Sequence, residues 1–394
     1  MIEVNNKIQE IYEVIVKSGL DEDQSLLGGS CGVSMFLFYY ARFVDDQKPY
    51  DIAFETMSST LEKINPISDL HTFASGLAGI GYSIENLSRN DFIDVDTKDI
   101  LGPIDELLFE RMKIDLNNGN YDFLHGALGI GLYFISRNAF EKRDEYLGYI
   151  VDELYILGEK DSNGIKWRSI LDNNTEKYGY NISLSHGMSS IIAFLSKIIK
   201  EEINKTKATF LLEGAVNYLL NQKLPANEYL SIFPSWALES TETIAPSRMA
   251  WCYGDLGISV SLWHASQALN RKDWKEEAIH TILHSAKRQD LSYNFVVDAG
   301  LCHGTAGMAL IFMRMYQYTG IEELKDTSDY WYQQTLKMAT FDDGLAGYKA
   351  YRAKISGGWA NEIGLLEGIA GIGLALISAV SDIEPAWDEC LLLS

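Results

Sequence analysis

Seven stretches of the chain share one pattern, in which a glycine opens a run of mostly apolar residues. The leading glycines are spaced by 47 to 67 residues, and in six stretches a second glycine follows three positions later; the fourth has Ser190 there. Runs that are apolar on nearly every side are typical of helices buried all round. The leading glycines are Gly29, Gly76, Gly126, Gly187, Gly254, Gly304 and Gly368.

The segments between these runs have the pattern of amphipathic helices. The segment 273–289 shows one apolar stripe at helical spacing, formed by Trp274, Ala278, Ile279, Ile282, Leu283 and Ala286. Each repeat therefore pairs an apolar helix with an amphipathic one. An open stack of such pairs would leave one face of every apolar helix in water, so we expect residues 1–394 to form a single all-α domain, closed into a ring of inner helices inside outer ones.

The glycine pairs predict where the repeats converge. The first glycine lets the chain turn into the helix, and the second leaves room where neighbouring helix starts crowd together. Residues just before the leading glycines should then lie on one rim, near helix N-termini that favour anions and thiolates. These residues are Gly28, Ser75, His125, His186, Tyr253, His303 and Glu367, preceded by Leu27, Ala74, Leu124, Ser185, Cys252, Cys302 and Leu366.

Cys252, Cys302 and His303 are candidate metal ligands at equivalent positions of two repeats. Two sulfurs and one imidazole leave tetrahedral zinc one open position, as in catalytic sites. With two thiolates the zinc has no net charge, so a third thiolate bound there would stay nucleophilic, while water would be acidified less than at a three-histidine site. The alternative is two small buried cysteines and a histidine that caps a helix.

Further groups on the predicted rim could move protons or stabilise charge. His186 and His125 could each serve as acid or base, or could simply cap helices. Asp122 could orient a histidine, accept a thiol proton or be an ordinary surface aspartate. Arg248, four residues before Cys252, could stabilise an enolate or pair with an acid. We expect no metal ligand among Cys31, Cys390, His280 and His284.

Composition limits the classes of partner. The chain has 55 acidic and 33 basic residues and a formal net charge of −22, which argues against nucleic acid and is compatible with a cationic peptide. The first residues lack the features of a signal peptide, and the longest apolar run, 368–380, is too short to span a bilayer. We therefore expect a cytoplasmic protein with reduced cysteines.

The motifs "SRMAWCYGDLG" and "GLCHGTAG", with "SHG" and "YDFLHG" upstream and "LLEGIAGIGLAL" downstream, resemble those of the lanthionine synthetase cyclases, the LanC family. The resemblance implies an α/α toroid of seven inner and seven outer helices, with catalytic zinc on Cys252, Cys302 and His303. It also implies a reaction, the addition of precursor-peptide cysteines to dehydroalanine or dehydrobutyrine, which closes thioether rings. By position, the family's active-site residues correspond to His186, Asp122, Arg248 and Tyr253.

The resemblance brings expectations beyond the ring itself. Some family members carry a small β-rich extension, for which the regions 158–182 and 222–248 are both candidates because they contain turn residues and β-formers. Both run directly into predicted site residues and should border the substrate opening. The implied partners are a dehydrated precursor peptide, a dehydratase and an ABC exporter, in a complex at the inner face of the membrane.

Three other functions fit parts of the pattern. A LanC-like protein could add glutathione to dehydro residues, and a non-catalytic scaffold could hold structural zinc and grip a peptide. Four protein ligands on the zinc would support the scaffold. A glycosidase on a related toroid would need paired carboxylates on the rim, and Glu367 is the one acidic residue at the position before a leading glycine.

Overall fold

The computed structural model describes residues 2–19, 23–64, 70–138, 140–172, 177–225, 228–238, 246–352 and 357–394. The chain divides into two compact units, one formed by residues 1–108 with 296–394 and the other by residues 109–295. We describe each unit by itself. Helices dominate both units, as the apolar pattern predicts, while the single domain over 1–394 stays a prediction.

Seven apolar helices begin directly after the seven leading glycines, which confirms the predicted helix starts. In α6 every residue from Ala127 to Ser136 is buried, as expected for a helix enclosed on all sides. The seven helices are α2 (Ser30–Val44), α4 (Leu77–Arg89), α6 (Ala127–Ser136), α8 (Met188–Lys200), α10 (Asp255–Ala268), α12 (Thr305–Thr319) and α14 (Ile369–Val380).

Amphipathic helices alternate with the apolar ones along the chain. Trp274, Ala278 and Ile282 of the predicted stripe are buried on α11, while Ile279 and Leu283 are half-buried. The amphipathic helices are α1 (Ile2–Ser18), α3 (Gln47–Lys63), α5 (Thr97–Asn117), α7 (Arg143–Leu157), α9 (Lys205–Leu220), α11 (Lys272–Ala286) and α13 (Glu322–Lys337).

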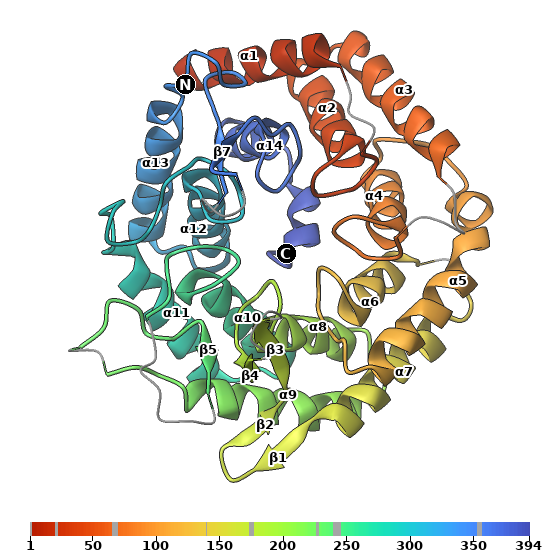
Figure 1. Ribbon diagram of the computed structural model, residues 1–394, viewed down its shortest axis with the longest axis vertical. Helices are drawn as coiled ribbons and strands as arrows, with labels where there is room; N and C mark the ends of the chain where they lie inside the picture. The colour runs from red at the N-terminus through yellow and green to blue at the C-terminus, as the bar shows by residue number, and fades with distance from the viewer. Residues whose placement is uncertain are drawn as a thin grey trace. The chain divides into compact units, whose positions relative to one another are not determined.

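Packing follows the predicted pairing within each unit. In the 109–295 unit α6, α8 and α10 pack against α7, α9 and α11 respectively, and α8 also contacts α6 and α10 (Figure 1). In the other unit α2 packs on α3, α12 on α13, and α14 on α1, α2 and α12. A short 3-10 helix, η2 (Ala386–Leu391), packs on α4.

The glycines before and within the helix starts are required mainly because a side chain there would collide with nearby backbone atoms. A Cβ on Gly76 or Gly187 would lie 2.1 or 2.2 Å from the carbonyl oxygen six residues earlier, and a Cβ on Gly307 would lie 1.9 Å from the Leu301 carbonyl oxygen. The chain entering each helix therefore folds back onto it. Gly254 also needs its conformational freedom, because its φ is +125°.

Backbone hydrogen bonds link these incoming segments within each unit. The Leu366 carbonyl accepts the N–H of Leu301 at 2.9 Å, the Leu366 N–H donates to Leu27 at 2.9 Å, and the Leu27 N–H donates to Ala74 at 3.2 Å. In the 109–295 unit the Leu184 N–H donates to Cys252 at 3.1 Å. Residues two or three positions before the leading glycines are thus joined to one another within each unit, as the repeat predicts for neighbouring helix starts.

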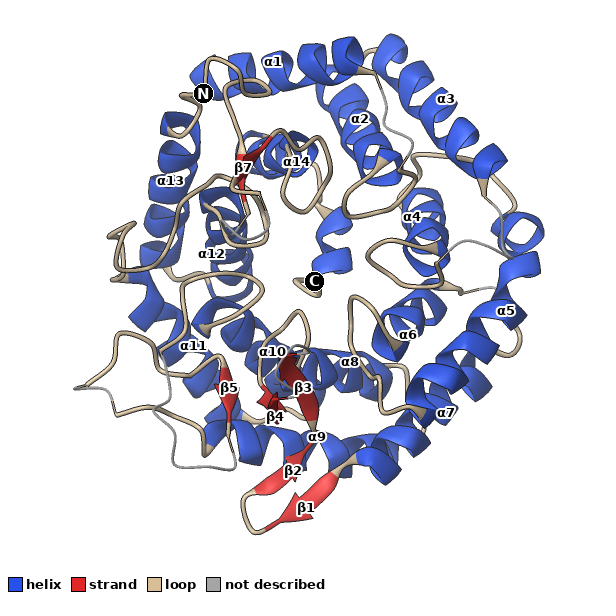
Figure 2. Cartoon of the chain, in the orientation of Figure 1, coloured by secondary structure: helices blue, strands red, loops and turns tan. Residues whose placement is uncertain are grey.

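Both regions predicted to hold a β-rich extension contribute strands to the 109–295 unit (red in Figure 2). The region 158–182 forms β1 (Glu159–Asp161), β2 (Gly164–Lys166), β3 (Ser169–Asp172) and β4 (Lys177–Asn181), and the region 222–248 forms β5 (Trp236–Ala237). β1 pairs with β2, and the order of the other antiparallel sheet is β3-β4-β5. In the described part of the other unit, β6 (Ala350–Tyr351) pairs with β7 (Trp359–Ala360).

No helix within the described part of the chain is long and apolar enough to cross a membrane.

Candidate functional site

A cavity of about 540 Å³ lies within the 109–295 unit, between the segment that precedes α6 and the hairpin formed by β3 and β4. Three of the residues predicted from the sequence line it, namely Asp122, His186 and Tyr253. Each stands in the short segment that leads into α6, α8 or α10, so the repeat itself brings them to one place.

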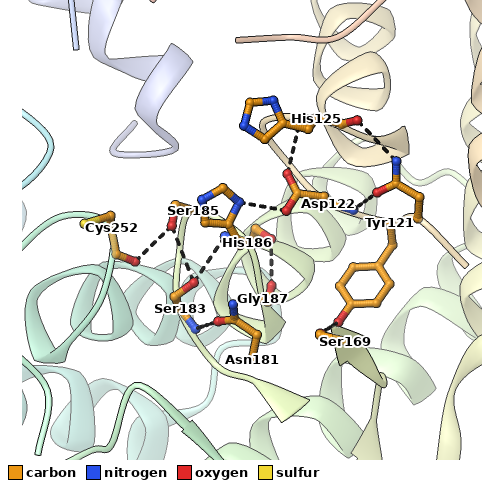
Figure 3. A network of polar contacts seen from close by, with 12 residues as sticks. Tyr121, Asp122, His125, Ser169, Asn181, Ser183, Ser185, His186, Gly187 and Cys252 are labelled. Carbon is orange, nitrogen blue, oxygen red and sulfur yellow. Dashed lines mark hydrogen bonds and ion pairs between the residues drawn. The ribbon is translucent and has the colours of Figure 1, made fainter. Parts of the chain in front are cut away.

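Asp122 and His186 form the best-defined contact in this cavity. The Nδ1 atom of His186 donates a hydrogen bond of 2.7 Å to Oδ2 of Asp122 (Figure 3). The other carboxylate oxygen accepts the backbone N–H of His125 at 2.8 Å, and the His186 N–H donates to Ser183 at 3.2 Å. The carboxylate thus fixes the imidazole ring, and Nε2 is the nitrogen that can exchange a proton with a substrate.

The environment favours the charged forms of both groups. Burial alone would lower the pKa of His186, but the hydrogen bond to Asp122 and the negative charge of that carboxylate outweigh it and raise the pKa above its ordinary value. Burial alone would raise the pKa of Asp122, and the bond to His186 instead holds it below its usual value. His186 is therefore suited to be a proton donor near neutral pH.

The rings of His125 and Tyr253 are both neighbours of the His186 ring. The His125 ring lies nearly parallel to it with 5.8 Å between centroids, and the Tyr253 ring centroid is 6.1 Å away. Burial and the neighbouring His186 lower the pKa of His125, although Asp122 opposes them. The Tyr253 hydroxyl accepts a hydrogen bond of 3.2 Å from the Asn181 side chain, which ties it to the end of β4.

Cys252 is tied through its backbone to the segment that carries His186. Its carbonyl oxygen accepts the N–H of Leu184 and of Ser185, and also the Ser185 hydroxyl at 3.3 Å (Figure 3). Its side chain is buried. A displacement of the segment before α10 would therefore move the segment before α8 as well.

Arg248 is half-buried, and its carbonyl oxygen lies against Gly254. The lining of the cavity, as far as the described residues define it, includes neither Arg248 nor Cys252. The structure thus brings together Asp122, His186 and Tyr253, and it leaves the predicted role of Arg248 a prediction.

Cys302 and His303 lie in the other unit, directly before α12. The Cys302 sulfur and a ring nitrogen of His303 are within 4.8 Å of each other. His303 Nε2 lies 3.3 Å from Oδ2 of Asp298, a buried carboxylate that also accepts the backbone N–H of Tyr351 at 2.8 Å. A carboxylate on one ring nitrogen of a histidine orients the other toward a metal.

The four side chains that we did not expect to be metal ligands lie elsewhere in the structure. The Cys31 thiol is buried and donates to Ser83 at 3.0 Å, and burial raises its pKa to about 12. Cys390 is buried within η2. His280 is exposed beside Glu277, and the His284 Nε2 donates to the Leu230 carbonyl at 2.7 Å.

Several residues of the site lie outside the sequence prediction. Asn181 and Ser183 hold the segment before α8, and Asp298 holds His303. Their partners are set by tertiary contacts, which the spacing of residues does not report. A signal did exist in the chain, since each of these polar residues stands within six positions of a leading glycine.

Sequence comparison finds a protein family and a relative that each match most of this chain. A family model described as "Lanthionine synthetase C-like protein" matches residues 21–392. The chain is 26% identical over 354 residues to "Nisin biosynthesis protein NisC" of Lactococcus lactis subsp. lactis, a match that covers 81% of this chain and 76% of that protein.

The fold also has a solved counterpart. The chain is similar to a structure titled "Nisin cyclase" with a TM-score of 0.76 and 20% sequence identity, over 99% of this chain and 96% of that chain. This likeness confirms the predicted fold class, the α/α toroid of inner and outer helices.

Proposed function

Because the chain belongs to the lanthionine synthetase C-like family, we propose that it is a zinc-dependent lanthipeptide cyclase, which adds cysteine thiols of a dehydrated precursor peptide to dehydroalanine or dehydrobutyrine. The products are (methyl)lanthionine rings. One observation carries this proposal, the Asp122–His186 pair that lines the cavity with its imidazole held at Nδ1. A proton donor in a cavity is what the second half of such an addition requires.

Cys252, Cys302 and His303 are the residues that would hold zinc. Two thiolates and one imidazole are a donor set that suits Zn²⁺ and leaves one of its four positions to a substrate. When bound, zinc would lower the pKa of the substrate thiol and so supply a thiolate near neutral pH. Asp298 would act through His303, by fixing the orientation of its ring.

In the proposed addition, the substrate sulfur forms a bond to the β-carbon of the dehydro residue, and the electron pair of the C=C bond moves into an enolate. The α-carbon then takes a proton from Nε2 of His186, whose pKa is raised. The thiol proton leaves to solvent, and solvent returns one to His186, so the net change is an isomerisation. The 2.7 Å hydrogen bond supports a positioning role for Asp122.

Tyr253 would orient the substrate or His186 from within the cavity, and Arg248 would do so from the segment before Cys252. We also propose that the protein receives its substrate from a dehydratase and works beside an ABC exporter, in a complex at the cytoplasmic face of the membrane. The family membership supports these partners, and co-purification with each of them tests the complex.

Ring formation is tested by counting thiols, because the mass of the peptide does not change. A dehydrated precursor is incubated with zinc-loaded protein, and free thiols are alkylated before and after. We expect loss of alkylatable cysteine with wild-type protein and a rate lowered by about 10²- to 10⁴-fold with His186→Asn, which removes the proton donor.

Zinc content of His186→Asn should equal that of the wild type, since His186 is not proposed as a ligand. Peptide binding without thiol loss, across several dehydrated precursors, would contradict the cyclase and favour the non-catalytic scaffold. Transfer of glutathione to the peptide in place of ring closure would favour the glutathione-adding alternative.

A further inference from the structure

One wall of the cavity is a β-hairpin that carries large apolar side chains outside the buried core. Ile170 on β3 and Tyr178 on β4 are directly opposite each other in the antiparallel register. Both line the cavity, yet they are 55% and 47% exposed. Cross-strand neighbours of this size present one continuous apolar surface, and such surfaces beside a cavity mark binding sites.

A cation completes this surface. The guanidinium carbon of Arg168 lies 4.8 Å from the centroid of the Tyr178 ring, and Arg168 lines the same cavity. This cation–π contact attracts the guanidinium to the ring. Arg168, Ile170 and Tyr178, which we call the hairpin surface, thus combine two apolar side chains with a donor that can bind peptide carbonyl oxygens.

The hairpin surface is held firmly relative to the Asp122–His186 pair. Tyr121 is the residue directly before Asp122, and its hydroxyl donates a hydrogen bond of 3.1 Å to the Trp167 carbonyl. The same hydroxyl makes a short contact with the Ser169 hydroxyl (Figure 3). Trp167 is fully buried, and its Nε1 donates to Leu154 of α7 at 2.9 Å. The hairpin is therefore a fixed wall beside the proton donor.

The position of this wall determines what it can contact. If the α-carbon of the dehydro residue is placed at His186, successive residues of an extended peptide lie about 3.3 Å apart. Because His186 and the hairpin surface line the same cavity, the side chains close to the reacting residue are the ones that share this space with the hairpin. We propose, on the basis of the cyclase function above, that the hairpin surface is a specificity subsite for a large apolar residue next to the dehydro residue.

The experiment compares two short synthetic peptides, each with one cysteine and one dehydroalanine, which differ only in leucine or glycine next to the dehydroalanine. The wild-type protein should have the higher kcat/KM for the leucine peptide. Ile170→Ala and Tyr178→Ala should each reduce the leucine-to-glycine ratio of kcat/KM by on the order of tenfold, mainly through KM. The glycine peptide should be unaffected, and Tyr178→Phe should keep the wild-type ratio.

Ile156→Ala is the matched control, because Ile156 is 70% exposed on α7 in the same unit and lies outside the described lining of the cavity. It should leave both peptides unchanged. A wild type without preference for leucine, or alanine variants that keep the wild-type ratio or slow both peptides equally, would overturn the subsite.

A binding measurement separates the subsite from the chemistry. Fluorescein-labelled versions of the two peptides, with serine in place of cysteine, cannot form a ring, and their Kd values are read by anisotropy. Loss of the leucine preference in Tyr178→Ala would support the subsite even if no ring ever formed. Equal Kd values for both peptides on the wild type would refute it, whatever the outcome of the thiol assay.

Discussion

At the scale of single residues, the hydrogen bond between Asp122 and His186 links the charge of one side chain to that of the other. Both pKa shifts have the same origin, since each group stabilises the ionised form of its partner. The repeat predicted that His186 and Asp122 stand near the rim. Their direct pairing was one of several alternatives that the sequence left open, because they are 64 residues apart and either could have contacted water or a different partner.

Replacing Asp122 with asparagine should shift the pH dependence of ring closure. His186 must be protonated to act as the acid, and its raised pKa extends the active range upward in pH. Asp122→Asn removes the negative charge that raises this pKa, so the decline of kcat with rising pH should begin at a lower pH than in the wild type. A profile of kcat against pH for both proteins measures the shift, and an unshifted basic limb would reduce Asp122 to a structural residue.

Replacing Cys302 with alanine should release the metal. One of the three proposed protein ligands is lost, and the remaining sulfur and imidazole bind zinc much more weakly. We expect about one zinc per wild-type chain and almost none in Cys302→Ala, measured by elemental analysis after dialysis. Cys31→Ala is the control, because the Cys31 thiol is buried beside Ser83 and should not affect zinc content. An active Cys302→Ala protein with full zinc would disprove the ligand assignment.

At the scale of elements, the sequence allowed the seven apolar helix starts to be predicted to the residue, because each follows a glycine that a larger residue could not replace. At the second glycine the expected crowding by a neighbouring helix start does occur, since a Cβ on Gly257 would lie 2.8 Å from Cβ of Leu184. At the first glycine the reason differs from the expected turn. The crowding comes from the carbonyl oxygen of the segment that enters each helix, as at Gly76 and Gly187. The sheet of β3, β4 and β5 was harder to predict. Its β4 strand pairs with β5, which has only two residues and therefore shows no periodic pattern in the sequence.

Gly254 tests this account of the helix starts. Its φ of +125° and ψ of −172° fall in a region that is nearly exclusive to glycine, and a Cβ would lie 2.0 Å from the Arg248 carbonyl oxygen. Gly254→Ala should lower the free energy of unfolding by about 3 kcal/mol or more. It should also weaken zinc binding, because Cys252 stands two residues earlier.

Gly320→Ala is the matched control for that variant. Gly320 also has positive φ, +68°, but nothing lies within 4 Å of a Cβ there. In this variant the free energy of unfolding should fall only by the cost of placing alanine at positive φ, about 1–2 kcal/mol. Its zinc content should not change. Denaturant unfolding measures both variants, and equal losses would show that crowding at Gly254 contributes nothing.

At the scale of the whole molecule, the formal net charge of −22 should influence how peptides approach. A cationic precursor is attracted over a distance set by the Debye length, which falls from about 30 Å at 0.01 M salt to about 8 Å at 0.15 M. The KM for a peptide of net positive charge should therefore rise over this range, while that for a neutral peptide should change little. Equal salt dependence for both peptides would exclude steering by the acidic surface.

The contact between the two ends of the described chain has a consequence for how the protein is made. The Leu366 N–H donates to Leu27, and α14 packs on α1 and α2. During synthesis, α1 and α2 leave the ribosome long before α14 exists, so the apolar surface that they bury against α14 stays uncovered until the last repeat is translated. Such late, long-range closure is slow and exposes nascent chains to aggregation. Production of this protein should thus depend on chaperones that hold the first repeat until the last one arrives.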